Sequence, residues 1–84
     1  MSSQNSDRRL LIIDDEPDLL ELLVETCKAI TPHVVSAQNG LEGLGVIQSQ
    51  KVHAVLSDIN MPKMTGLELL AKIRELGIET PFVF

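Results

Sequence analysis

Aromatic residues are almost missing from this chain, which contains no Trp, no Tyr and two Phe, Phe82 and Phe84. Its core must therefore be aliphatic, and the hydrophobic fraction of 44% is rich in Leu, Ile and Val, as in proteins with a buried parallel sheet. A length of 84 residues allows one small domain, whose core is marginal on size alone.

Cysteine and long apolar runs are also scarce. Cys27 is the one cysteine, which excludes an intrachain disulfide, and we interpret it as a small hydrophobic residue on a helix. No apolar run is long enough to span a membrane, and the first residues lack the charged and then apolar pattern of a signal peptide. We therefore expect a cytoplasmic protein without membrane contacts.

Cations are outnumbered by acids, with 7 Lys and Arg against 12 Asp and Glu and a net charge of −5. A surface that binds nucleic acid needs clustered Lys and Arg to neutralise phosphates. This balance argues against direct nucleic-acid binding and favours protein partners.

Short apolar runs alternate with amphipathic segments along the chain. The pattern predicts strands over 9–13, 33–37, 53–57 and 82–84, and helices over 17–30, 41–50 and 66–76. Such alternation calls for right-handed crossovers and a parallel sheet with helices on both faces. The polar residues 1–8 precede it and are predicted to be a flexible leader, which leaves 9–84 as the folded part.

Several local features of the predicted helices can be tested. Gly43 and Gly45 should both weaken the helix over 41–50, whereas Glu68 should face Lys72 one turn away. The helix over 17–30 should bury a broad apolar stripe, made of Leu19, Leu20, Leu22, Leu23, Cys27 and Ile30. Gly77 should end the third helix.

Two histidines lie near strand starts, without a companion at ligand spacing. We interpret His33 and His53 as solvent-exposed residues at strand ends, and neither is expected to bind a metal or carry phosphate.

Acidic residues follow two of the predicted strands. Asp14, Asp15 and Glu16 come after the run 9–13, and Asp58 comes after the run 53–57. If these runs are neighbouring parallel strands, their carboxylates converge at one edge of the sheet, where α/β proteins place their ligands. Helix capping explains Glu16 and Asp18 in simpler terms, but two consecutive carboxylates opposite Asp58 exceed what a cap needs. Clustered oxygen ligands suit a hard divalent cation, most often Mg²⁺.

These residues carry a resemblance to a known family. Ile12-Ile13-Asp14-Asp15-Glu16, together with Ser57-Asp58-Ile59-Asn60-Met61-Pro62-Lys63-Met64-Thr65-Gly66, resembles the receiver domain of bacterial two-component response regulators, from about Arg9 to the last residue. The resemblance implies a flavodoxin-like, doubly wound parallel sheet with strand order 2-1-3-4, in which the fifth strand and its flanking helices are absent. Residues 9–84 would then be a partial receiver domain.

The resemblance also implies roles for individual residues. Asp58 would accept a phosphoryl group from a histidine kinase or phosphotransfer protein, in a Mg²⁺-dependent reaction that switches an output. The metal would be held by Asp15 directly, by Asp14 through water, by Asp58 and by the backbone carbonyl of Asn60. Such a phosphoacceptor assists its own phosphorylation and is not a turnover enzyme. Met61 and Met64 are interpreted as packing residues and Lys63 as a solvated charge.

Receivers also use a Ser or Thr after the fourth strand and a Lys after the fifth, and neither position has a counterpart here. The chain is a fragment, a trimmed protein or a natural short form, and we expect a fragment. An exposed strand over 82–84 predicts a homodimer. Because the Ser or Thr and the Lys have no counterpart, a phosphorylation-incompetent module for interaction or dimerisation is an alternative function. A metal-dependent phosphatase of the haloacid dehalogenase type fits less well, because its Asp-x-Asp motif differs from Asp14-Asp15-Glu16.

Overall fold

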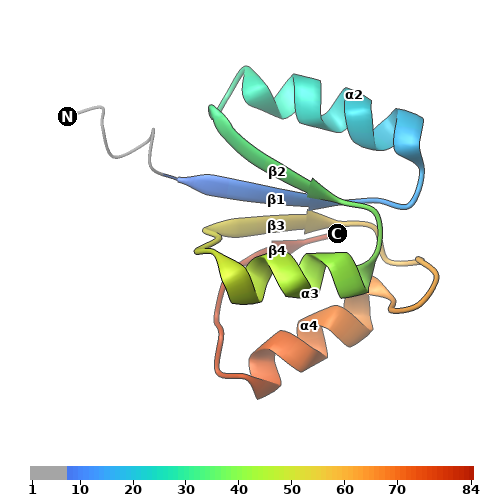
Figure 1. The fold of residues 1–84 in the computed structure, drawn as a ribbon, viewed down its shortest axis with the longest axis vertical. Coiled ribbons are helices and arrows are strands. Elements are labelled where there is room, and N and C mark those ends of the chain that lie inside the picture. Colours follow the sequence, from blue (N-terminus) through green and yellow to red (C-terminus); the bar gives the residue numbers. More distant parts are fainter. Residues whose placement is uncertain (1–7) are drawn as a thin grey trace.

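The computed structural model of the protein describes residues 8–84, so the leader predicted for residues 1–8 lies outside the described part except for Arg8. Seven elements follow one another in the order expected (Figure 1), with ends within two residues of the prediction. They are β1 (Arg9–Ile13), α2 (Pro17–Lys28), β2 (His33–Ala37), α3 (Gly40–Ser49), β3 (Ala54–Ser57), α4 (Gly66–Glu75) and β4 (Phe82–Val83).

The four strands form one parallel sheet with the order β2-β1-β3-β4, which confirms the predicted order 2-1-3-4. In this sheet Ile13, the last residue of β1, pairs with Ala37 of β2 on one side and Ser57 of β3 on the other. The three strands therefore end level, and the residues that follow them meet at one edge of the sheet.

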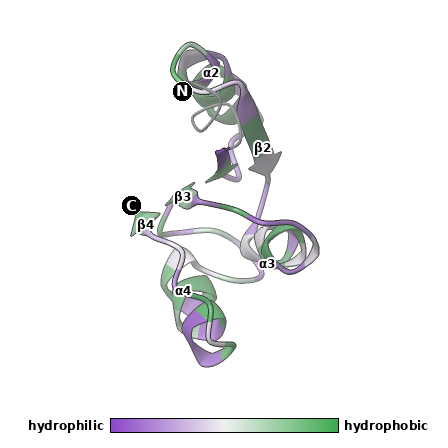
Figure 2. Ribbon diagram, turned by 90° about the vertical axis from the view of Figure 1, so that its left-hand side faces the viewer, coloured by the Kyte–Doolittle hydropathy of each residue, from purple (hydrophilic) through white to green (hydrophobic). Residues whose placement is uncertain are grey.

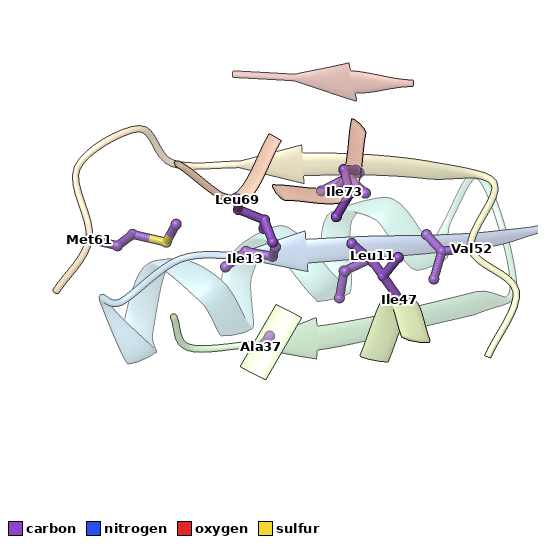
Figure 3. Packing of buried hydrophobic residues seen from close by; sticks show 9 residues of the cluster. Leu11, Ile13, Ala37, Ile47, Val52, Met61, Leu69 and Ile73 are labelled. Carbon is purple, nitrogen blue, oxygen red and sulfur yellow. The ribbon is translucent and has the colours of Figure 1, made fainter. Parts of the chain in front are cut away.

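Helices α3 and α4 lie on one face of the sheet and α2 lies on the other (Figure 2). The main core fills the space between the sheet and helices α3 and α4. Its fully buried members include Leu11, Ile13, Val55, Leu69 and Ile73, and Figure 3 shows side chains of the sheet meeting those of the helices there. This packing fixes the central strands β1 and β3, which carry the acidic residues.

The face under α2 is covered less completely than predicted. Helix α2 packs on β1 and β2, and Leu20 is its one buried residue. Leu19 and Leu22 are 44% and 62% exposed, and Ile30 lies beyond the end of the helix at 83% exposure. The prediction of a broad buried stripe is therefore wrong, because a single helix meets only half of this face.

Helix α4 makes polar contacts that the sequence did not predict. Glu68 and Lys72 line one surface pocket, but they form no ion pair in residues 8–84. Glu68 forms a capping box at the start of α4: its carboxylate accepts from the Thr65 N–H (2.9 Å) and its own N–H donates to the Thr65 hydroxyl (3.1 Å). Lys72 instead pairs with Glu75 at 3.6 Å. The positive φ of Gly77, 82°, agrees with its predicted place after the helix.

The histidines separate into two environments. His33 is exposed, as predicted. His53 is half-buried, and its Nδ1 accepts the Arg9 N–H at 3.0 Å, so the prediction of a simple exposed residue is wrong for it. Cys27 is a free, half-buried cysteine. None of the helices in residues 8–84 is both long and apolar enough to cross a membrane.

Candidate metal and phosphoacceptor site

The acidic site begins with the register of the sheet. Asp14 and Asp58 each extend a strand by one residue, since the Asp14 N–H donates to the Ala37 carbonyl (3.1 Å) and the Asp58 N–H donates to the Ile13 carbonyl (3.0 Å). The paired ends of β1 and β3 therefore place these two residues side by side at the carboxyl edge.

Three carboxylates converge at this edge. Asp14, Asp15 and Asp58 each offer an oxygen, and these oxygens all lie within 4.8 Å of one another. Asp14 is buried, with 6% exposure, whereas Asp15 and Asp58 face solvent. The predicted convergence of the two acidic segments is therefore present in the structure.

No cationic side chain of residues 8–84 forms an ion pair with these carboxylates. Unit charges this close repel each other by about 1 kcal/mol per pair even at the dielectric constant of water. The one ion pair that residues 8–84 form joins Lys72 to Glu75 on α4, outside the cluster. Three oxygen ligands without a cationic partner match the donor set of a hard divalent ion.

The start of α2 explains part of the cluster by local structure. Asp14 accepts the Glu16 N–H at 2.9 Å, which orients one of its oxygens toward the helix entry. Glu16 occupies the N-cap position but its side chain makes no capping hydrogen bond. Asp18 lies in the first turn, where an acid complements the helix dipole. Asp15 has no such local role, which leaves its carboxylate available for a ligand.

A pocket of about 220 Å³ adjoins the cluster on the α2 side of the sheet. Asp14 and Asp58 contribute its polar wall, and the remaining lining comes from β1, β3 and α2 through Ile12, Ile13, Leu19, Leu23, Leu56 and Ser57. A reactant at Asp58 would therefore meet carboxylates on one side and aliphatic side chains on the other.

The loop between β3 and α4 carries the remaining candidate ligand, Asn60, which is exposed. Met61 anchors this loop, because its side chain is 7% exposed and belongs to the core, as predicted for a packing residue. Lys63 is exposed, but its φ of 72° and the hydrogen bond from Met64 N–H to the Pro62 carbonyl (2.8 Å) define a tight γ-turn. The sequence did not predict this conformation for a lysine.

The geometry first defines a class of protein: a flavodoxin-like α/β domain with a carboxylate cluster at the carboxyl edge of its sheet. The family model of the response regulator receiver domain matches residues 10–84. The chain belongs to this family, the receiver domains of two-component systems.

Relatives in sequence are parts of longer signalling proteins. The chain is 35% identical over 81 residues to the sensor histidine kinase RcsC of Escherichia coli strain K12. The aligned region covers 96% of this chain and 8% of RcsC. It is 39% identical over 74 residues to the transcriptional regulatory protein GlrR of the same strain, which covers 88% of this chain and 17% of GlrR. The chain thus spans less than a fifth of either relative.

Solved structures agree with the fold. The N-terminal domain of an uncharacterized protein from Wolinella succinogenes superposes with a TM-score of 0.86 at 32% identity, covering 89% of this chain and 60% of that one. The response regulator TrrA from Thermotoga maritima, solved in complex with Mg²⁺-BeF, superposes with a TM-score of 0.77 at 37% identity. The match covers 82% of this chain and 60% of the TrrA chain.

Proposed function

We propose that Asp58 is the phosphoacceptor of this receiver domain and takes its phosphoryl group from a histidine kinase or phosphotransfer protein to switch a downstream output. The observation that carries the proposal is the convergence of Asp14, Asp15 and Asp58 within 4.8 Å at the edge of the sheet. Asp58 is exposed and directly follows β3 beside the pocket, so a donor reaches it from solvent.

In the proposed reaction a carboxylate oxygen of Asp58 attacks the phosphorus of the donor and forms an acyl phosphate. The bond from phosphorus to the donor's imidazole nitrogen breaks, and the imidazole leaves with the electron pair. With a small acyl phosphate as donor, the phosphorus–oxygen bond breaks instead and a carboxylate leaves. Each protein molecule accepts one group, so the domain acts as a switch and not as a turnover enzyme.

Mg²⁺ is the proposed cofactor. Asp15 and Asp58 would bind it directly, Asp14 through water, and Asn60 through its backbone carbonyl. When bound, the ion neutralises charge on the transferring phosphoryl group. The uncompensated cluster of carboxylates supports this donor set. The Mg²⁺ complex of TrrA supports it by analogy within the family.

We further propose that residues 9–84 are a partial receiver domain preceded by a leader over 1–8, in a cytoplasmic protein. A homodimer through β4 is part of this proposal, because β4 is an edge strand whose Val83 is 58% exposed and is followed by Phe84 at 45%. The same exposure favours the second candidate function, an interaction or dimerisation module that is not phosphorylated.

Intact mass spectrometry distinguishes the two candidates. The protein is incubated with a small acyl phosphate in the presence of Mg²⁺ or EDTA, with Asp58→Asn as the control. We expect a gain of one phosphoryl group that requires both Mg²⁺ and Asp58. A chain that gains no mass under these conditions would instead support the unphosphorylated interaction module.

A further inference from the structure

A buried hydroxyl lies directly before the proposed phosphoacceptor. Ser57 is the last residue of β3 and is 3% exposed. Besides Asp14, it is the one buried polar residue in the described part of the chain. A hydroxyl in such a place needs a hydrogen-bond partner, because burying it unpaired is costly.

The partner of this hydroxyl belongs to Asp58. Ser57 Oγ donates to the backbone carbonyl of Asp58 at 2.8 Å. The N–H of Asp58 is held separately, by the Ile13 carbonyl at 3.0 Å. The backbone of Asp58 is therefore held at both of its peptide groups, one through the sheet and the other through the serine.

The surroundings of this carbonyl are closed by the start of α4. A Cβ atom on Gly66 would contact the Asp58 carbonyl oxygen and would lie 3.2 Å from Ser57 Oγ. The Gly66 N–H in turn donates to the Ile59 carbonyl at 2.8 Å. Removal of the Ser57 hydroxyl takes away the one side-chain donor that this carbonyl has among the described residues.

We propose that Ser57 is a positioning residue for the site: its hydroxyl fixes the peptide group between Asp58 and Ile59, and so orients both the Asp58 carboxylate and the loop that brings Asn60 to the ion. This inference rests on the proposed function of Asp58. It assigns a role to a residue that touches neither the donor nor the metal and acts through the backbone of its neighbour.

The test compares two pairs of proteins. Within each pair the side chain at position 57 has nearly the same volume, but only one member carries the hydroxyl. Wild type is compared with Ser57→Ala, and Ser57→Thr with Ser57→Val. Ser49→Ala is the matched control, because the Ser49 hydroxyl also donates to a backbone carbonyl, that of Val46 at 3.3 Å, but lies at the exposed end of α3.

Three quantities are measured for each variant: the Mg²⁺ dissociation constant from an NMR titration, the initial rate of phosphoryl gain from a small acyl phosphate at saturating Mg²⁺, and the free energy of unfolding in EDTA. Loss of the hydroxyl should weaken Mg²⁺ binding about three- to tenfold in both pairs, the factor that one hydrogen bond is worth. The rate should fall by a similar factor, while Ser49→Ala changes neither.

A purely structural role gives a different pattern. If removal of the hydroxyl lowers only the free energy of unfolding, and Mg²⁺ affinity and rate stay equal within both pairs, the positioning role is wrong. The comparison of Ser57→Thr with Ser57→Val remains valid even if their larger side chains destabilise both variants. A wild-type protein that gains no phosphoryl group refutes the proposed function of Asp58, whereas equal Mg²⁺ affinities refute the role of Ser57.

Discussion

At the scale of single residues, the site combines groups that repel each other. Asp14, Asp15 and Asp58 hold their oxygens within 4.8 Å, and no cationic side chain pairs with them in residues 8–84. Like charges at this distance favour the unfolded chain unless a cation binds between them. The site should therefore lower the stability of the protein in the absence of metal.

Neutralising Asp58 tests this cost. Asp58→Asn should raise the free energy of unfolding in EDTA by about 1 kcal/mol, because it removes two repulsive pairs at a solvent-exposed position. Added Mg²⁺ should stabilise the wild type and have much less effect on the variant. Urea denaturation with and without Mg²⁺ measures both effects, and Glu79→Gln at an exposed position outside the cluster is the control. Equal responses of wild type and Asp58→Asn to Mg²⁺ would contradict the assignment.

The backbone conformation of Lys63 should also lower the stability of the protein. Its φ of 72° is unfavourable for a residue with a Cβ atom, so Lys63→Gly should stabilise the protein by about 0.5–1 kcal/mol. The same change at Lys72, inside α4, should destabilise it by about 1 kcal/mol. Thermal unfolding of the two variants gives the comparison. A loss of stability in Lys63→Gly would show that its side chain matters more than the strain.

At the scale of elements, α3 contains two glycines that look equivalent in the sequence but differ in the structure. A Cβ on Gly43 would lie 2.5 Å from the Cδ1 atom of buried Ile13, whereas no atom lies within 4 Å of a Cβ on Gly45. Gly43 thus permits the close approach of α3 to β1, and only Gly45 weakens the helix without a packing benefit.

The two alanine variants should shift stability in opposite directions. Gly45→Ala should stabilise the protein by about 0.5–1 kcal/mol through helix propensity. Gly43→Ala should destabilise it by about 1–3 kcal/mol, since the core must move to admit the methyl group. Chemical denaturation measures both, and equal gains would mean that α3 is free to move away from Ile13.

These elements show what the sequence could predict. Apolar runs and helical periodicity predicted every element, because periodicity follows from local pattern. The convergence of Asp14 with Asp58 also required the two strands to be neighbours, which local pattern does not determine. The family resemblance supplied the strand order. The pattern could not distinguish Gly43 from Gly45, choose the partner of Glu68, or identify the role of the Ser57 hydroxyl. Each of these depends on which atoms the tertiary fold brings together.

At the scale of the whole molecule, exposed apolar side chains occur on the edge strand β4 as well as on the helices. Exposed large side chains include Leu19 and Leu22 on α2, Leu41 on α3, Leu67 on α4 and Val83 on β4. An edge strand with exposed apolar side chains favours association with another chain.

Association through β4 predicts a dependence on concentration. Sedimentation velocity of the 84-residue chain should show a dimer whose fraction rises with concentration, and Val83→Lys should abolish it by placing a charge on the edge. Ile30→Lys, at the highly exposed position after α2, should leave the dimer intact. A monomer at every concentration would exclude the homodimer.

One measurement identifies which of the three clustered carboxylates receives the phosphoryl group. The protein is phosphorylated with a small acyl phosphate and Mg²⁺, reduced with borohydride to convert an aspartyl phosphate into homoserine, and mapped by peptide mass spectrometry. We expect homoserine at position 58 and intact aspartates at positions 14 and 15. Homoserine at position 14 or 15, with Asp58 unmodified, would contradict the proposed role of Asp58.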